Sequence, residues 1–342
     1  MKALVKFASG KGNMEIRDVE EPCPRAGQVL IEVKAAGICA TDVHIYDGGF
    51  ETRVPVIIGH EFSGVIARLG EGVREFRLAE PVPAETTAYL CGRCPFCKSG
   101  DYNMCPERLV LGIHVNGGFT RFLVVGERYV HRLPENIDFD EGVFSEPLAC
   151  SIHAVLERGE VKPNDTVLVS GPGTIGLLTM QVAKAKGCTV FVCGISKDAE
   201  RLALAKRLGA DVLINVDEEN LEGVVKSHTN GLGADVAVEC AGAARSIGQC
   251  IESLRQRGKL IQIGLAGRPL EVDFDKVANN EIHVLGSRSH TSKTWKTAME
   301  LFHQGKVKTQ SLVSKKLPLS SWEEGLADAR EGRGVKVILT PI

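Results

Sequence analysis

The sequence predicts an α/β protein of two domains, one rich in β-structure and one a doubly wound parallel sheet of the kind that binds dinucleotides. Three observations support this fold class. The chain has 342 residues, more than a single hydrophobic core usually accommodates. Residues 1–130 carry short β-like runs broken by glycine and proline. After residue 160, short apolar runs alternate with helix-like segments.

The first region contains strand-like runs without long helices between them. QVLIEVKAAG at 28–37 and VIIGHEFSGVIARLG at 56–70 are examples, and such a succession favours an antiparallel or barrel-like domain. The tail from residue 290 has mixed content and ends in the strand-like KVILTPI at 336–342. We expect this tail to rejoin the first domain.

The second region contains six short, nearly all-apolar runs. They are TVLVSG (166–171), TVFVCG (189–194), DVLINV (211–216), DVAVEC (235–240), KLIQIG (259–264) and IHVLGS (282–287). Helix-like segments lie between them, among them 174–187 and 198–210. Strands of this composition belong to a parallel sheet covered on both faces. Six of them fit a doubly wound dinucleotide fold.

Charge and hydropathy exclude several classes of function. The chain has 41 basic and 43 acidic residues and a formal net charge of −2, without a block of like charge. No nucleic-acid or membrane partner is therefore expected. The N-terminal segment lacks the apolar stretch of a signal peptide, and no run approaches the roughly 20 apolar residues of a membrane span. We expect a cytoplasmic protein whose 11 cysteines are free thiols or metal ligands.

A glycine-rich turn follows the first of the six runs. GPGTIG places Gly171, Gly173 and Gly176 in G-x-G-x-x-G spacing, after a strand and at the start of a helix. Gly171 would allow the tight turn, Gly173 the close approach of a pyrophosphate to the helix N-terminus, and Gly176 close packing of helix on strand. A simple glycine turn is the alternative, but the surrounding strand and helix favour a dinucleotide site.

The second run indicates which dinucleotide binds. It ends at Cys193-Gly194, where an NAD-preferring site usually offers an acidic residue to the ribose 2′-hydroxyl. Gly194 leaves room for a 2′-phosphate. Ser196, Lys197 and Arg201 could bind that phosphate by hydrogen bonds and charge, although the two basic residues could also be solvated helix charges. The pattern predicts NADP in preference to NAD.

Four cysteines stand close together in the first third of the chain. Cys91, Cys94, Cys97 and Cys105 follow the spacing C-x2-C-x2-C-x7-C. Four thiolates at this spacing can converge tetrahedrally on one Zn²⁺ and leave no position open to substrate. An iron–sulfur cluster is the competing chemistry, and four unrelated buried thiols are the other alternative. The pattern favours a structural zinc site.

A second set of metal-ligating residue types is spread along the chain. It comprises Cys39, the adjacent pair His60-Glu61, and Glu146. A cysteine, a histidine and a carboxylate are a suitable set for a catalytic zinc that keeps one position open to a substrate oxygen. Each residue alone would be an ordinary buried thiol or polar group, so only the combination is informative.

Six segments carry a resemblance to a known family. They are GICATD, GHEFSG, the four-cysteine segment, SEPLAC, GPGTIG and VAVECAGA, in this order. In them the chain resembles the zinc-dependent medium-chain alcohol dehydrogenases, and among these the sorbitol (polyol) and threonine dehydrogenase group. The resemblance covers essentially the whole length. It implies a GroES-like catalytic domain at 1–150 and 290–342, with a zinc lobe at about 88–108, and a Rossmann domain at 151–289.

The resemblance also implies how metal and dinucleotide are held. Cys39 and His60 would bind the catalytic zinc, and Glu61 and Glu146 would complete its coordination as ligands or through zinc-bound water. The chain would thus carry two zinc ions, one catalytic and one structural. The residues expected to bind NADP or NAD are Gly171, Gly173, Thr174, Ile175, Gly176, Gly194, Ser196, Lys197, Arg201, Ala241 and Gly264.

Two residues near Cys39 would handle the substrate proton in such an enzyme. Thr41 would accept a hydrogen bond from the substrate hydroxyl, and His44 would pass the proton toward solvent. Zinc would lower the pKa of the alcohol, and hydride would then move to C4 of the nicotinamide. A turn hydroxyl and a surface histidine are the alternatives for these two side chains.

Two positions depart from the family pattern. Relatives usually carry Gly-Asp-Arg-Val where this chain has Ala79-Glu80-Pro81-Val82-Pro83. The two prolines remove backbone donors and confine a strand to an edge or an irregular path. Ala40 also stands where glycine is customary. If that position requires a positive φ, alanine would cost about 1 kcal/mol there.

The motifs specify the substrate less well than the family. CATDVHIY is closer to threonine dehydrogenases, whereas Glu146 and the segment 286–301 resemble polyol dehydrogenases. We expect a secondary alcohol of a polyol or sugar alcohol as the small-molecule substrate. L-threonine is one alternative, and a sugar-alcohol phosphate facing Arg288 or His290 is another. A catalytically impaired nucleotide-binding protein is the non-enzyme alternative. The resemblance alone suggests a homotetramer or homodimer.

Overall fold

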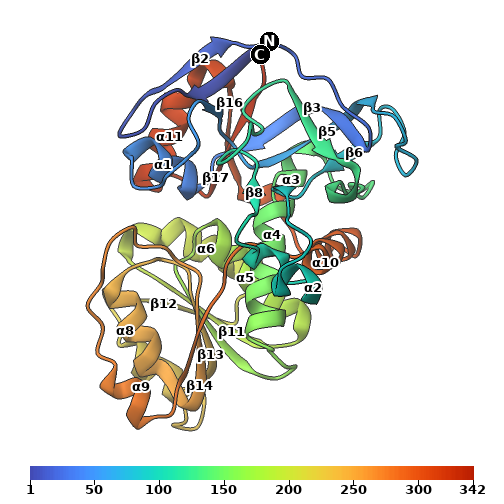
Figure 1. Ribbon diagram of the computed structural model, residues 1–342. Helices are drawn as coiled ribbons and strands as arrows, with labels where there is room; N and C mark the ends of the chain where they lie inside the picture. The colour runs from blue at the N-terminus through green and yellow to red at the C-terminus, as the bar shows by residue number, and fades with distance from the viewer. The chain divides into compact units, whose positions relative to one another are not determined.

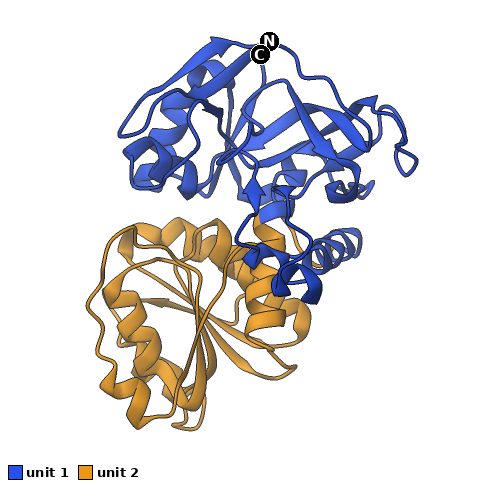
Figure 2. Ribbon diagram, in the orientation of Figure 1, with its two compact units in different colours: residues 1–146, 291–304, 309–342 blue, residues 147–290, 305–308 orange.

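The computed structural model describes the whole chain, residues 1–342, which divides into two compact units (Figure 2). Unit 1 consists of Met1–Glu146, Thr291–Gln304 and Thr309–Ile342, and unit 2 of Pro147–His290 and Gly305–Lys308. Both chain ends therefore belong to unit 1. Gly305–Lys308, which lie in the tail expected to rejoin the first domain, pack with unit 2.

Unit 1 is built mainly of strands. Its larger sheet has the order β16-β17-β3-β5-β6, with β9 also paired to β3, and a second sheet has the order β2-β1-β4. The strands are β1 (Lys2–Lys6), β2 (Met14–Asp18), β3 (Gln28–Gly37), β4 (Val56–Ile57), β5 (Glu61–Leu69), β6 (Pro81–Pro83), β7 (Thr87–Tyr89), β8 (Leu109–Val110), β9 (Phe122–Gly126), β16 (Val313–Pro318) and β17 (Lys336–Thr340). Its helices are α1 (Ala40–Asp47), α2 (Pro95–Ser99), α3 (Phe139–Gly142), α10 (Ser292–His303) and α11 (Trp322–Glu331).

Strand β3 is the centre of the unit 1 core. It pairs antiparallel with β5, β9 and β17, and its apolar residues Val29, Ile31 and Val33 are buried. They belong to one hydrophobic cluster with Phe62 of β5 and Trp322 of α11. Because β17 and α11 come from the C-terminal tail, this tail completes the sheet and its core.

The proline-containing segment forms the short edge strand β6. Residues alternate along a strand, so the backbone groups of Val82 face β5 and those of Pro81 and Pro83 face away from it. On that far side the proline carbonyls accept N–H groups from Leu133 and His131 at 3.0 and 3.1 Å. The missing proline donors therefore remove no hydrogen bond from β5, and the expected edge position is confirmed.

The two family departures differ in backbone conformation. Ala40 is the first residue of α1 and is not among the residues with positive φ, so the cost considered for it does not arise. Ala79 has a φ of 63°, the left-handed region in which a Cβ is strained. The strain expected at Ala40 therefore lies at Ala79, where relatives carry glycine.

Unit 2 is an open parallel sheet with helices on both faces. Its order is β12-β11-β10-β13-β14-β15, and every neighbouring pair is parallel. The strands are β10 (Thr166–Ser170), β11 (Thr189–Gly194), β12 (Val212–Asn215), β13 (Ala234–Glu239), β14 (Leu254–Gln262) and β15 (His283–Gly286). The helices are α5 (Thr174–Lys186), α6 (Ala199–Arg207), α7 (Leu221–Ser227), α8 (Ala244–Ser253) and α9 (Asp275–Asn279), with α4 (Ser145–Ile152) beginning at the end of unit 1.

The strand order of unit 2 confirms the predicted doubly wound sheet. α5 and α8 lie on opposite sides of the sheet (Figure 1). The order reverses between β10 and β13, and such folds bind their ligands at this reversal, beyond the carboxyl ends of the strands. Across both units, no helix has the length and apolar character needed to cross a membrane.

Candidate functional site

Cys39, His60 and Glu61 come together in unit 1, where their ligand atoms all lie within 4.8 Å of one another. Cys39 is the N-cap of α1, just after β3, and His60 directly precedes β5, which Glu61 begins. β3 pairs with β5 so that Gly37 lies opposite Glu61. The register of the sheet therefore brings together residues that are distant in the sequence.

The glycine at position 37 leaves room for a buried ion pair. A Cβ on Gly37 would lie 2.6 Å from Glu61 Oε2 and 3.2 Å from the Lys336 side chain. Lys336 is 3 % exposed and donates from Nζ to Glu61 Oε2 at 2.5 Å and to the Ile38 carbonyl at 3.1 Å. Burial opposes the lysine charge, but the negative charges of Glu61 and Cys39 outweigh it and raise the pKa of Lys336. One oxygen of Glu61 is thus held by a buried cation.

Asp42 places a further carboxylate beside His60. It is fully buried; Oδ2 accepts the N–H of Cys39 at 2.8 Å, and Oδ1 lies 3.6 Å from His60 Nδ1. Neither Asp42 Oδ1 nor His60 Nδ1 has a hydrogen-bond partner. Burial raises the pKa of Asp42. Burial opposes the charge of His60, but nearby negative groups, Asp42 foremost, raise its pKa well above 6.5.

This donor set fits zinc. A thiolate, an imidazole and a carboxylate are ligands that Zn²⁺ takes, and three protein ligands leave a fourth position for water or substrate. Cys39, Glu61 and Asp42 bring three acidic groups to this cluster, and a divalent cation would balance their charge when they are deprotonated. Asp42 also stands where a carboxylate usually orients a metal-bound imidazole through its second nitrogen.

Glu146 lies outside the group of three ligand residues. It is the second residue of α4, and its charge contributes to the raised pKa of His60. The structure therefore brings together three of the four expected ligand residues and leaves Glu146 at longer range. Thr41 and His44 lie three positions apart on α1 and are both half-buried. They share a face of the helix that Cys39 caps.

The second group is the four-cysteine segment. The sulfur atoms of Cys91, Cys94, Cys97 and Cys105 lie within 4.8 Å of one another, with 3.9 Å between Cys91 and Cys97 and 3.6 Å between Cys91 and Cys105. A tetrahedron with Zn–S bonds of about 2.3 Å has edges of about 3.8 Å. All cysteines of the chain are free. The sulfur geometry therefore fits one zinc ion.

Local backbone geometry prepares these sulfurs for a cation. Cys94 is the N-cap of α2, and its Sγ accepts the N–H of Cys97 at 3.4 Å, as Cys91 Sγ accepts that of Cys94. The N–H groups of Arg93 and Cys94 lower the pKa of Cys91 to about 6, whereas burial and neighbouring thiols raise the pKa of Cys97 to about 12. N–H groups directed at sulfur are typical of thiolate metal sites.

The glycine turn of unit 2 has the geometry that its spacing predicts. Gly171 has a φ of 95°, and a Cβ there would lie 3.1 Å from Ala241. A Cβ on Gly176 would lie 1.9 Å from the Gly171 carbonyl oxygen, so the helix could not pack on the turn. Gly173 is the N-cap of α5, and a Cβ there would meet nothing within 4 Å. Thr174, which begins α5, follows at the helix N-terminus, where an anion binds favourably.

The end of β11 lacks an acidic side chain, and one of the two basic residues after it, Arg201, is paired with a carboxylate. Ser196 and Lys197 are exposed. The N–H of Ser196 donates to Asp217 Oδ2 at 2.9 Å. Arg201 Nη1 donates to Asp198 Oδ1 at 3.2 Å. Of the three expected phosphate contacts, Arg201 is therefore the most compensated and Lys197 the least.

Asp217 and Arg245 form an ion pair beside this region. Arg245 Nη1 lies 2.9 Å from Asp217 Oδ1, and the pKa of Asp217 is lowered by the N–H of Ser196 and then by the guanidinium. Gly194 is closely packed, because a Cβ there would lie 3.0 Å from the Pro172 ring. A 2′-phosphate here would meet the cations Lys197 and Arg201 but also the carboxylate of Asp217.

Ala241 and Gly264 follow β13 and β14 at the same edge of the sheet. A Cβ on Gly264 would lie 2.3 Å from the N atom of Gly242, so the two loops touch through their backbones. Through Ala241 they also touch the turn at Gly171. The structure thus gathers the expected dinucleotide residues at the carboxyl edge of one sheet.

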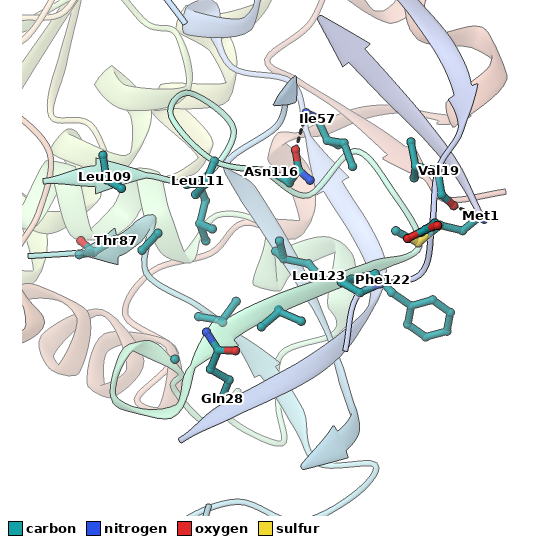
Figure 3. A pocket seen from close by; sticks show the side chains of 17 residues that line it. Met1, Val19, Gln28, Ile57, Thr87, Leu109, Leu111, Asn116, Phe122 and Leu123 are labelled. Carbon is teal, nitrogen blue, oxygen red and sulfur yellow. Dashed lines mark hydrogen bonds between the residues drawn. The ribbon is translucent and has the colours of Figure 1, made fainter. Parts of the chain in front are cut away.

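A pocket of about 400 Å³ in unit 1 is distinct from these groups (Figure 3). Apolar side chains such as Ile57, Leu111 and Leu123 line it, with Gln28 and Asn116 among the few polar ones. It contains none of the expected metal-binding or dinucleotide-binding residues. We therefore do not assign it as the active site.

The sequence pattern missed several residues of these groups. The position of Asp42 could have been predicted from the sequence, because an acidic residue three positions after an N-cap completes a capping box. Lys336 reaches Glu61 from the other end of the chain, and the pairing of Asp217 with Arg245 joins the segment after β12 to α8. No local pattern indicates contacts of this kind.

Comparison with known proteins agrees with this geometry. Residues 25–135 match the alcohol dehydrogenase GroES-like domain, and residues 174–304 match the zinc-binding dehydrogenase family. The chain is 41% identical to sorbitol dehydrogenase of Halalkalibacterium halodurans, with 100% of each chain covered. It is 37% identical to D-arabitol-phosphate dehydrogenase of Enterococcus avium, with 99% of this chain and 97% of the relative covered.

A solved structure from Sinorhizobium meliloti, described as a zinc-binding dehydrogenase bound to NADP, superposes with a TM-score of 0.91 at 30% identity, and 99% of each chain is covered. The predicted GroES-like and Rossmann folds, the alcohol dehydrogenase class and the zinc and NAD(P) cofactors are thereby confirmed. The chain belongs to the zinc-dependent medium-chain alcohol dehydrogenases, in the group that resembles sorbitol and threonine dehydrogenases.

Proposed function

We propose that this chain transfers hydride between a secondary alcohol of a polyol or sugar alcohol and NAD(P), with NADP slightly preferred. The observation that carries the proposal is the convergence of Cys39, His60 and Glu61 within 4.8 Å of one another. This donor set leaves one coordination position open, as a catalytic zinc requires. The four-cysteine group would hold a second, structural zinc.

In the proposed reaction the cofactors and the side chains near Cys39 would have separate roles. When bound, zinc supplies a Lewis acid and the dinucleotide supplies a hydride acceptor. Thr41 would orient the substrate hydroxyl by accepting its hydrogen bond, and His44, on the same face of α1, would carry the proton toward solvent. Glu146, at longer range than the other three ligand candidates, would act through a water or through its charge.

The preference for NADP would be modest. Gly194 offers no carboxylate to a ribose, Lys197 is exposed, and a relative of similar fold is described as bound to NADP. The carboxylate of Asp217 accepts the N–H of Ser196, and Arg201 is paired with Asp198. These carboxylates weaken the cationic character that a strict NADP site would need.

A sugar-alcohol phosphate is the second candidate substrate, and the 37% identity to D-arabitol-phosphate dehydrogenase favours it. Of the two side chains considered for a phosphate contact, His290 is fully buried and Arg288 is exposed. Only Arg288 could therefore meet such a group without rearrangement. L-threonine is a third candidate, supported by the CATDVHIY motif and by 34% identity to L-threonine 3-dehydrogenase of Bacillus velezensis.

We expect the enzyme to work in the cytoplasm as a homotetramer or homodimer. The family resemblance supports an oligomer, and the balanced charge and reduced cysteines are compatible with the cytoplasm. Sedimentation equilibrium of the purified chain would give the mass of the assembly directly, and a monomer would contradict this part of the proposal.

Measurement of the zinc content tests the proposed metal sites. The wild-type chain should contain about two zinc ions. Cys39→Ser should retain one zinc ion, because the four-cysteine group is intact. It should lose dehydrogenase activity, because the proposed catalytic zinc loses a ligand. Cys105→Ser should also retain one, with a lower melting temperature, since structural zinc contributes folding energy. Two zinc ions and full activity in Cys39→Ser would refute the assignment.

A further inference from the structure

Glu239, the last residue of β13, is a buried carboxylate with no role in the assignments above. Its exposure is 0%, and it pairs in register with Ser170 of β10, beside the reversal of strand order. A carboxyl group so deeply buried requires hydrogen bonds that compensate for its lost solvation. All hydrogen-bond partners of its side chain are neutral groups.

The groups around this carboxylate are all donors. Oε1 accepts the N–H of Ala241 at 2.9 Å, the N–H of Gly242 at 2.9 Å and the hydroxyl of Ser246 at 2.7 Å. Oε2 accepts Nε2 of Gln262 at 2.6 Å and Gly242 N–H at 3.1 Å. A carboxylate offers acceptors on both oxygens, which matches this set of donors. A glutamine would place an NH₂ group against one of these donors.

The same network joins the end of β10 to the loops that follow β13 and β14. Because the Ser246 hydroxyl proton is directed at Glu239, Ser170 Oγ donates to Ser246 Oγ at 2.7 Å. The backbone carbonyl of Glu239 accepts the N–H groups of Ile263 and Gly264, each at 3.0 Å. Glu239 therefore fixes the loop after β13, residues 240–243, and the loop after β14 to the end of β10.

These loops leave no free space against the glycine turn. A Cβ on Gly242 would lie 2.6 Å from the Leu265 carbonyl oxygen, and Ala241 lies 3.1 Å from a Cβ built on Gly171. Gln262 Nε2 also donates to the Gly264 carbonyl at 2.8 Å. A shift of either loop would therefore change the surface at the carboxyl edge of the sheet, where a dinucleotide binds.

We propose that Glu239 is a positioning residue for the dinucleotide, which holds the loops 240–243 and 263–265 in the form that binds this cofactor. The inference rests on the proposed placement of the dinucleotide at this edge. Glu239 does not need to touch the cofactor. Its loss would act through the N–H groups of Ala241 and Gly242, which would be left without an acceptor.

The test compares variants at the two ends of strand β13. Glu239→Gln removes the charge and one acceptor at the carboxyl end. Asp235→Asn is the matched control at the amino end, where Asp235 accepts the N–H of Thr166 at 2.8 Å and Nε of Arg255 at 2.7 Å. Ser246→Ala is a milder second variant that keeps the carboxylate. Titration of intrinsic NADPH and NADH fluorescence gives Kd for each protein, and thermal melting gives stability.

Both Glu239→Gln and Asp235→Asn should melt at lower temperature than the wild type. Glu239→Gln should raise Kd for both dinucleotides by about tenfold and Ser246→Ala by about two- to fivefold, whereas Asp235→Asn should leave Kd unchanged. The KM for dinucleotide should rise more than kcat falls, and the zinc content should not change. Wild-type Kd in Glu239→Gln, or an equal rise in Asp235→Asn, would overturn the inference. If Glu239→Gln does not fold, a wild-type Kd in Ser246→Ala would overturn it. A wild-type chain that binds neither dinucleotide would overturn the proposed function as well.

Discussion

Single glycines leave room for close contacts in both units. At Gly37 a Cβ would occupy the space in which Lys336 meets Glu61, and at Gly176 it would overlap the Gly171 carbonyl oxygen. At Gly173, by contrast, a Cβ would meet nothing within 4 Å. The absence of a side chain has a packing reason at the first two positions, whereas the packing of the chain gives none at Gly173.

The two glycines of the nucleotide turn should respond differently to alanine. Gly173→Ala should leave the melting temperature unchanged and weaken dinucleotide binding, because its methyl group would meet only the bound pyrophosphate. Gly176→Ala should lower the melting temperature by several degrees, since the overlap at 1.9 Å must be relieved by a backbone shift. Thermal melting and NADPH fluorescence titration distinguish the two. Unchanged binding in Gly173→Ala would argue against the proposed pyrophosphate position.

The two alanines that replace family glycines should also differ. Ala79→Gly should raise the melting temperature by about 1–2 °C, because relief of the left-handed strain exceeds the added freedom of the unfolded chain. Ala40→Gly should lower it by a similar amount, because glycine is unfavourable in a helix. Calorimetry of both variants tests this pair. A lower melting temperature in Ala79→Gly would show that its backbone is not strained.

At the scale of elements, an ionic cluster joins β16 to α11. Lys315 of β16 donates to Asp328 of α11 at 2.8 Å, and Arg333 donates to the other oxygen at 2.7 Å. The hydrogen bond from Lys315, and then that from Arg333, hold the pKa of Asp328 below its ordinary value of 3.8 although burial opposes this. A carboxylate with a lowered pKa stabilises the fold above its unfolded value and loses this contribution as pH falls.

Asp328→Asn should therefore lower the melting temperature at pH 7, and the difference from wild type should shrink as pH falls below about 3.8. The control is Glu331→Gln, because Glu331 forms only an exposed pair with Arg333 at 3.0 Å, which contributes little. Melting curves from pH 7 to pH 3 give the result. A difference that stays constant over this range would exclude an ionic origin.

Much of the element arrangement could be predicted from the sequence. The six apolar runs of unit 2 correspond to β10–β15 because strands buried on both faces need continuous apolar residues. The edge position of β6 followed from Pro81 and Pro83, which cannot donate hydrogen bonds. The conformations of Ala40 and Ala79 could not be predicted, since φ at a single position depends on the turn around it.

The candidate site was only partly predictable. Sequence reasoning identified Cys39, His60 and Glu61 through residue type and motif, but the longer range of Glu146 required the fold. The ion pair of Lys336 with Glu61 depends on strand pairing between opposite ends of the chain. The engagement of Arg201 by Asp198 likewise appears only in three dimensions.

At the scale of the whole molecule, the two units contribute different chemistry. All eight candidate metal-binding residues lie in unit 1, and the expected dinucleotide-binding residues lie in unit 2. In the proposed function, hydride transfer would use the metal group of unit 1 and the dinucleotide group of unit 2. Catalysis should therefore depend on both groups, whereas dinucleotide binding alone should survive the loss of Cys39.

The most direct test is the initial rate of absorbance change at the reduced-nicotinamide band. Wild type and Cys39→Ser are compared with polyols, sugar-alcohol phosphates, 2,3-butanediol and L-threonine, each with NAD⁺ and NADP⁺. We predict a rate with a polyol in the wild type, faster with NADP⁺, and none in Cys39→Ser, which still binds NADPH. The account would be contradicted by an equal rate in Cys39→Ser, or by no rate with any of these alcohols in a wild-type chain that holds two zinc ions.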